Sequence, residues 1–112
     1  MTKITIYRKD NRIVKYEAVG HANYAEIGKD IVCASISVIL QNVIMGIQIL
    51  GINFNFKMES GYMLVDLTDI DLQNKEKELE ILLETMVSMV EGLSKQYPEY
   101  ITYKNKKEND EK

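Results

Sequence analysis

The single cysteine and single histidine of the chain, Cys33 and His21, lie close together in the sequence. Gly20 directly precedes the histidine, and Asp30 stands shortly before the cysteine. Because Asp is a favoured N-cap residue, a helix that begins at Asp30 would place Cys33 in its first turn. There the helix dipole and the free backbone N–H groups stabilise a thiolate, the nucleophilic form of cysteine. These residues predict an activated thiol at the start of a helix.

Such a pair supports nucleophilic catalysis. His21, at the end of a predicted strand, would deprotonate Cys33 and then protonate a leaving amine. The free N–H groups of Val32 and Cys33 would hold an oxyanion. Spacing alone leaves the ordinary alternatives open. A lone cysteine in an apolar helix is often a small buried hydrophobe, a loop histidine is often a surface residue, and Asp30 is often only a cap.

Length and composition narrow the class of protein. The chain has 112 residues, 46% of them hydrophobic and 28% charged, which is typical of one folded domain and not of a disordered chain. A net charge of −3 argues against a nucleic-acid partner. One cysteine excludes an internal disulfide and a cysteine-rich zinc site. The start of the chain is polar and lacks the apolar run of a signal peptide, so we expect a cytoplasmic protein.

Alternating apolar and polar residues predict two β-hairpins. Residues 3–7 and 12–19 alternate on either side of the turn signal Asp10-Asn11. Residues 53–59 and 62–67 alternate in the same way around a second short polar turn.

Apolar residues at helical spacing predict one helix after each hairpin. The first is expected over residues 30–50, ending at Gly51, and the second over residues 75–95, ending before Pro98. Residues 100–103 predict a short final strand.

The order of these elements predicts an α+β fold. We expect a two-layer domain with a largely antiparallel sheet from two hairpins and both helices on one face, ββαββα with a short final strand. Residues 1–103 are expected to form the single domain, and residues 104–112 a charged, disordered tail.

A long uncharged segment, residues 31–56, also qualifies as a candidate membrane span by its length. Polar side chains are spread through it and no basic cluster flanks it, so a helix buried on two sides within a folded domain is the better interpretation. We therefore expect no membrane association.

The uncharged helix also predicts a homodimer. Its face toward the sheet would include Ile36, Val43 and Ile47, and another sector mixes polar and apolar side chains. This mixed sector consists of Cys33, Ser37, Leu40, Gln41, Ile44 and Gln48. An uncharged surface of this length usually marks an interface, so we expect a second copy of the chain to cover it.

Two segments, Gly20-His21-Ala22 and residues 28–37 (GKDIVCASIS), resemble the signature of the ribosomal-processing cysteine protease family, Prp. In that signature a GHA segment is followed, after a short variable stretch, by G-x-D-I-V-C-A-A-x-S. Only Ser35 departs from it, where the family has a second alanine. The similarity extends over nearly the whole chain.

The resemblance implies a bacterial cysteine endopeptidase that removes the N-terminal extension of ribosomal protein L twenty-seven and so supports assembly of the large ribosomal subunit. It implies that Cys33 is the nucleophile and His21 the acid and base. Gly20, Asp30 and Ser37 would support the loop and the helix start. It also implies a homodimer that uses neither cofactor nor metal. A third catalytic residue is not evident.

Two other functions stay open on the sequence. One is a non-catalytic, dimeric assembly or binding factor for a ribosomal protein, in which the thiol would show ordinary reactivity. The other is an enzyme with a persulfide or redox-active cysteine, which ranks last because the chain has no second cysteine to resolve such an intermediate.

Overall fold

Five strands and two helices follow one another as ββαββαβ in the computed structural model, which describes residues 1–20 and 27–107, with side chains described over 1–20 and 31–107. Their bounds are β1 Thr2–Lys9, β2 Arg12–Val19, α1 Ile27–Ile49, β3 Asn55–Glu59, β4 Tyr62–Asp66, α2 Glu76–Gln96 and β5 Ile101–Lys107. Both predicted hairpins are confirmed. Asp10 and Asn11 both take positive φ, 53° and 68°, as a tight turn between twisted strands requires.

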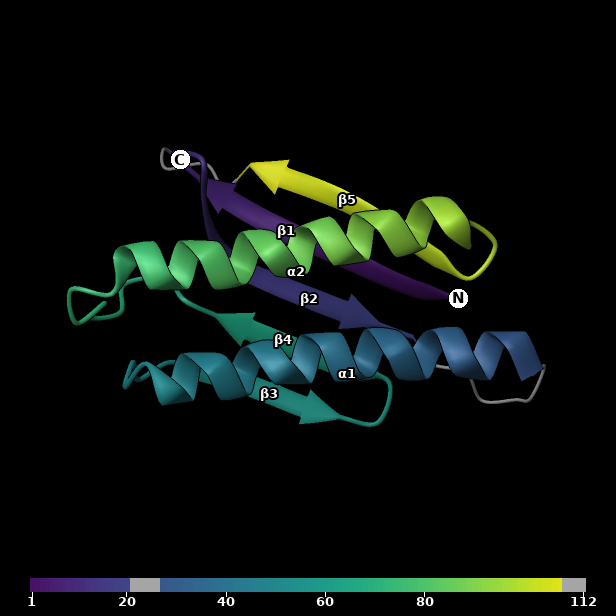
Figure 1. Cartoon of the computed structure of the whole chain (residues 1–112), viewed down its shortest axis with the longest axis horizontal. Helices are drawn as coiled ribbons and strands as arrows, with labels where there is room; N and C mark the ends of the chain where they lie inside the picture. The colour runs from purple at the N-terminus through teal and green to yellow at the C-terminus, as the bar shows by residue number, and fades with distance from the viewer. Residues whose placement is uncertain (21–26, 108–112) are drawn as a thin grey trace.

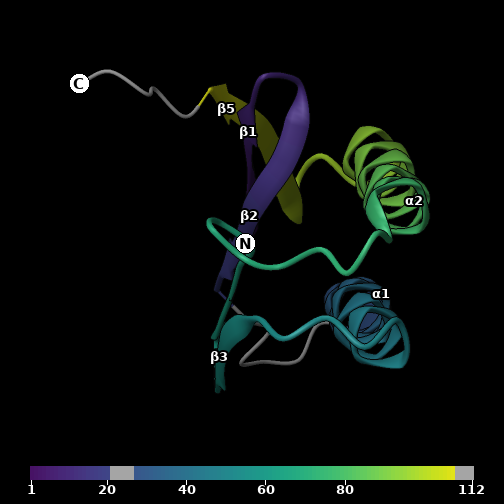
Figure 2. The same ribbon diagram turned by 90° about the vertical axis from the view of Figure 1, so that its left-hand side faces the viewer.

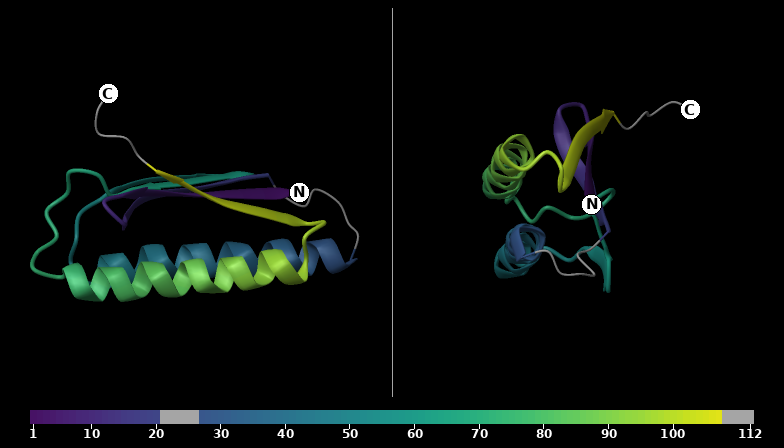
Figure 3. Two further views of the ribbon diagram at one scale, coloured as in Figure 1. Left: turned by 90° about the horizontal axis from the view of Figure 1, so that it is seen from above. Right: turned by 90° about the vertical axis from the view of Figure 1, so that its right-hand side faces the viewer.

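The strands form one sheet in the order β3-β4-β2-β1-β5. All neighbouring strands pair antiparallel except β1 and β5, which run parallel. Both helices lie side by side on one face of this sheet (Figure 1), and the views along and above the sheet show two separate layers (Figures 2 and 3). The predicted two-layer α+β fold is confirmed.

The core lies between the sheet and the helices. Alternate residues of β1 and β2 point toward the helices, and Ile4 pairs with Ala18 while Ile6 pairs with Tyr16. From α1 the buried side chains come at helical spacing: Val32, Ile36, Leu40, Val43, Ile44 and Ile47. Tyr16 is fully buried, and its hydroxyl donates a hydrogen bond to the Leu40 carbonyl at 3.0 Å. This contact fixes α1 on the sheet.

The final strand is longer than the sequence predicts. β5 runs to Lys107, whereas the predicted domain ends at residue 103 and assigns residues 104–107 to a disordered tail. That part of the prediction is wrong because the free edge of β1 offers backbone partners along its length, with Thr2 opposite Ile101 and Arg8 opposite Lys107. The charged side chains of an edge strand remain in solvent. Residues 108–112 lie outside the described residues.

One face of α1 is apolar and exposed. Its residues Ile31, Val38, Met45 and Ile49 are all more than half exposed. α1 is thus buried on the two sides that face the sheet and α2, as expected, and exposes this third side. The residues Ile31–Ile49 are long and apolar enough to cross a membrane by length and composition alone. A core helix passes the same test, and the opposite side of α1 is packed in the core.

The predicted mixed sector of α1 needs a correction. Leu40 and Ile44 are 1% and 4% exposed, so they belong to the core and not to a surface that a partner chain could cover. The reason is that α1 packs against both the sheet and α2, which widens its buried stripe beyond one quadrant.

Candidate active site

Cys33 lies at the end of the molecule where four elements meet. The start of β1, the end of β2, the first half of α1 and the turn between β3 and β4 come together there (Figure 1). They line a cavity of about 150 Å³ that is open to solvent. Its lining residues are Thr2, Ala18, Gly20, Cys33, Ile36, Ser37, Leu40, Gln41, Met58, Glu59, Gly61, Tyr62 and Met63. The fold thus brings three of the predicted site residues, Gly20, Cys33 and Ser37, to one cavity.

The helix that carries Cys33 begins earlier than predicted. α1 starts at Ile27, so Asp30 is its fourth residue and not its N-cap, and Cys33 is its seventh residue. The free N–H groups of a helix belong to its first turn. The N–H groups of Val32 and Cys33 therefore lie within the helix, and the prediction that they hold an oxyanion is wrong.

The Cys33 thiol is half-buried and borders the cavity. Its sulfur lies 3.4 Å from the Thr2 hydroxyl oxygen, across from the start of β1. The thiol thus combines access to the cavity with a polar neighbour, which an ordinary core cysteine lacks.

A polar ridge continues from Cys33 along α1. Ser37 and Gln41 follow at one-turn intervals and also line the cavity. The Gln41 amide nitrogen donates a hydrogen bond to the Ser37 hydroxyl at 2.8 Å. Cys33, Ser37 and Gln41 of the predicted mixed sector therefore line the cavity, whereas Gln48 does not, and Ser37 is oriented by its neighbour Gln41.

Gly20 holds the end of β2 against the start of β1. Its φ of +108° is one that side chains rarely allow, and a Cβ added here would overlap the carbonyl oxygen of Met1. Its N–H donates to the carbonyl of Gly61 at 2.9 Å. A glycine before His21 is therefore explained by close backbone packing beside the cavity.

Two predicted residues are not placed by the described side chains. His21 lies outside the described residues, as does the side chain of Asp30. The predicted pairing of His21 with Cys33, and the role of the Asp30 carboxylate, therefore remain predictions.

Several cavity residues are not signalled by the sequence motifs. Glu59 and Tyr62 come from the turn region between β3 and β4, and Thr2 comes from β1. The Tyr62 hydroxyl donates to Glu17 at 2.9 Å, and this hydrogen bond raises the pKa of Tyr62 above its ordinary value. Within the described part of the chain, no group of three or more His, Cys, Asp and Glu side chains could hold a metal ion.

The sequence matches a known family over most of its length. The family model for cysteine protease Prp matches residues 1–102. The chain is 28% identical over 102 residues to the ribosomal processing cysteine protease Prp of Bacillus subtilis (strain 168), covering 87% of this chain and 90% of that protein. It is 32% identical over 85 residues to the protein of that name from Staphylococcus aureus (strain Mu50 / ATCC 700699), covering 73% and 76% of the two chains.

Solved structures share the fold. SMU.848 from Streptococcus mutans superposes with a TM-score of 0.83 at 28% identity, covering 96% of each chain. The Staphylococcus aureus ribosomal processing protease Prp with a covalently linked product peptide gives 0.79 at 25% identity, covering 95% of this chain and 100% of that one. The same protease with a substrate peptide gives 0.81 at 24% identity, with the same coverage, which is a likeness of fold.

Proposed function

The chain belongs to the cysteine protease Prp family, and we propose that it is an endopeptidase that removes the N-terminal extension of ribosomal protein L twenty-seven. The observation that carries this proposal is the half-buried thiol of Cys33 at a cavity shared with the signature residues Gly20 and Ser37. The relatives named ribosomal processing cysteine protease support the same class of substrate.

The proposed reaction has two steps, both centred on Cys33. In the first, the thiolate attacks the carbonyl carbon of the scissile peptide bond, the C–N bond breaks, and His21 gives its proton to the leaving amine. The extension is then held as a thioester on Cys33. In the second step, His21 takes a proton from water, the resulting hydroxide attacks the thioester, and the carboxylic acid and the thiolate are released.

We also propose that the protein acts as a homodimer in the cytoplasm, without a nucleic-acid partner. The exposed apolar face of α1, formed by Ile31, Val38, Met45 and Ile49, supports the dimer because such a surface usually marks an interface. The acidic net charge supports the absence of a nucleic-acid partner.

The direct test is incubation of the purified chain with the extended precursor, followed by mass spectrometry of the products. We expect release of the extension by the unmodified chain and none by Cys33→Ala, with a large loss of turnover for His21→Ala. Ser35→Ala is the matched control. The Ser35 hydroxyl donates to the Ile31 carbonyl within its own helix, and alanine is the residue of the family signature.

Cleavage by Cys33→Ala would contradict the proposal. Binding of the precursor without cleavage, together with slow alkylation of Cys33 at mildly acidic pH, would instead indicate a non-catalytic assembly factor.

A further inference from the structure

Thr2 contacts the proposed nucleophile from a different part of the chain. Among the residues whose side chains are described, it is the one buried residue with a non-aromatic polar side chain, at 5% exposure. Its hydroxyl oxygen lies 3.4 Å from the Cys33 sulfur. A buried hydroxyl needs a hydrogen-bond partner, and the thiol sulfur is the side-chain partner that the described residues provide.

The backbone holds Thr2 in this position from several directions. Its N–H donates to the Tyr100 carbonyl at 2.9 Å, and it pairs with Ile101 at the start of β5. On the other side, the backbone of Gly20 approaches Met1 so closely that no side chain fits there. The alternation of β1 then directs the Thr2 side chain toward the helices, as it does for Ile4.

The chemistry of the contact depends on the state of the sulfur. A thiol and a hydroxyl can each donate to the other. A thiolate can only accept, so the hydroxyl must then donate to it. Hydrogen bonds to an ionised partner are roughly twice as strong as those between neutral groups. With a thiolate, the Thr2 hydroxyl would therefore make the stronger of the two possible hydrogen bonds.

We propose that Thr2 is a positioning residue of this site, whose hydroxyl donates a hydrogen bond to the Cys33 thiolate, stabilises it and holds its sulfur at the cavity. The importance of this bond for cleavage rests on the proposed function. The bond itself can be tested without any substrate, because the chain has a single cysteine and every alkylation of a thiol therefore occurs at Cys33.

The experiment compares the rate at which iodoacetamide alkylates four full-length proteins as a function of pH. These are the unmodified chain, Thr2→Val, Thr2→Ser and Thr5→Val. Val keeps the shape of Thr and suits a strand, but it lacks the hydroxyl. Ser restores the hydroxyl. Thr5→Val makes the same change on the same strand, on the opposite face of the sheet.

We expect Thr2→Val to slow alkylation about tenfold near pH 6, since the loss of a hydrogen bond to a charged group changes an equilibrium by roughly that factor. Thr2→Ser and Thr5→Val should match the unmodified chain. The difference should vanish near pH 10, where free thiols are ionised in any case. In the cleavage assay, Thr2→Val should lower kcat and leave KM unchanged.

Equal alkylation rates for Thr2→Val and the unmodified chain across this pH range would overturn the proposal and leave Thr2 with a packing role. A tenfold slowing that persists at high pH would also overturn it, because it would indicate altered access instead of altered ionisation. If Thr2→Val does not fold, as judged by circular dichroism, Thr2→Ala replaces it in the same comparison. Slower alkylation of Thr2→Val, together with no cleavage of the precursor by the unmodified chain, would support the hydrogen bond and reject the proposed substrate.

Discussion

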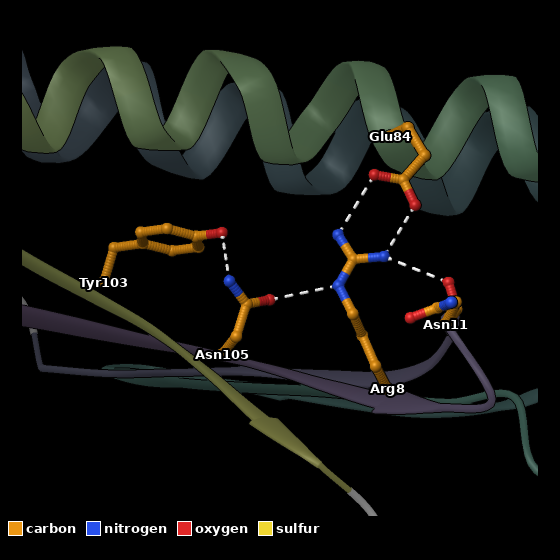
Figure 4. Close-up of polar contacts among 5 residues, drawn as sticks. All are labelled: Arg8, Asn11, Glu84, Tyr103 and Asn105. Carbon is orange, nitrogen blue, oxygen red and sulfur yellow. Dashed lines mark hydrogen bonds and ion pairs between the residues drawn. The ribbon is translucent and has the colours of Figure 1, made fainter.

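The guanidinium of Arg8 on β1 holds both carboxylate oxygens of Glu84 on α2, at 2.7 and 3.0 Å (Figure 4). The same guanidinium donates to the Asn11 carbonyl and to the Asn105 side chain, each at 3.2 Å. Asn105 in turn donates to the Tyr103 hydroxyl at 2.8 Å. Arg8 therefore ties the first hairpin, β5 and α2 together, at the opposite end of β1 from Thr2.

This pair predicts a loss of stability in acid. The hydrogen bond from Arg8 lowers the pKa of Glu84 below its ordinary value of 4.5. Because the pKa of Glu84 is lower in the folded chain, the pair contributes its full stability at a pH above the pKa of the unfolded chain. That stability is lost as the pH falls through the pKa of the folded chain. Glu84→Gln should lower the free energy of unfolding by about 1 kcal/mol at neutral pH, a figure kept small by solvent screening, and by less in strong acid.

Urea unfolding at several pH values checks this expectation. The matched control is Glu91→Gln, which removes a more exposed ion pair with Lys95 at 3.8 Å on the same helix. This control should change the stability very little. Equal losses for the two variants would show that the bidentate geometry of Arg8 and Glu84 adds nothing.

The burial of Tyr16 predicts a loss of stability in alkali. Burial raises the pKa of its hydroxyl well above the ordinary value of 10.0. The folded chain therefore holds the neutral phenol. The contribution of this buried phenol to stability is complete below pH 10.0 and is lost as the pH rises toward the pKa of Tyr16 in the folded chain. Tyr16→Phe should cost about 1 kcal/mol at neutral pH through the lost bond to Leu40. It should also reduce the loss of stability above pH 10.0. Thermal melting from neutral to alkaline pH measures both effects, and an unchanged alkaline slope would contradict the prediction.

Gly20 predicts a strong effect of one added methyl group. Gly20→Ala would force a side chain into positive φ and against the Met1 carbonyl, so we expect a loss of about 1–3 kcal/mol in thermal or urea unfolding. Gly92→Ala is the control, because an added Cβ on this exposed part of α2 meets open space. Alanine favours a helix interior over glycine by about 0.5–1 kcal/mol, so this variant should gain stability. A tolerated Gly20→Ala would show that the backbone beside the cavity can move apart.

The sequence predicts the elements of this fold better than it predicts the site. Period-two alternation in β1 and β2 and helical spacing in α2 depend on local residues, and both predictions are confirmed. The predicted start of α1 is wrong. Asp is a favoured N-cap residue, but the helix extends past Asp30 back to Ile27. Thr2 lies far from Cys33 in the sequence, and their contact arises only when β1 and α1 pack together. No local pattern carries that information.

The last prediction concerns the exposed face of α1. Met45 is 57% exposed in the middle of this face, so Met45→Lys should place a charge in the proposed dimer interface and split the dimer. Ile44 is a poor choice for this test because it is 4% exposed, and a lysine there would disrupt the core. Ser88→Lys is the control, on an exposed position of α2. Analytical ultracentrifugation at micromolar concentrations should show a dimer for the unmodified chain and for Ser88→Lys, and a monomer for Met45→Lys. A monomer at every concentration of the unmodified chain would reject the dimer and leave the exposed apolar face of α1 available to the substrate.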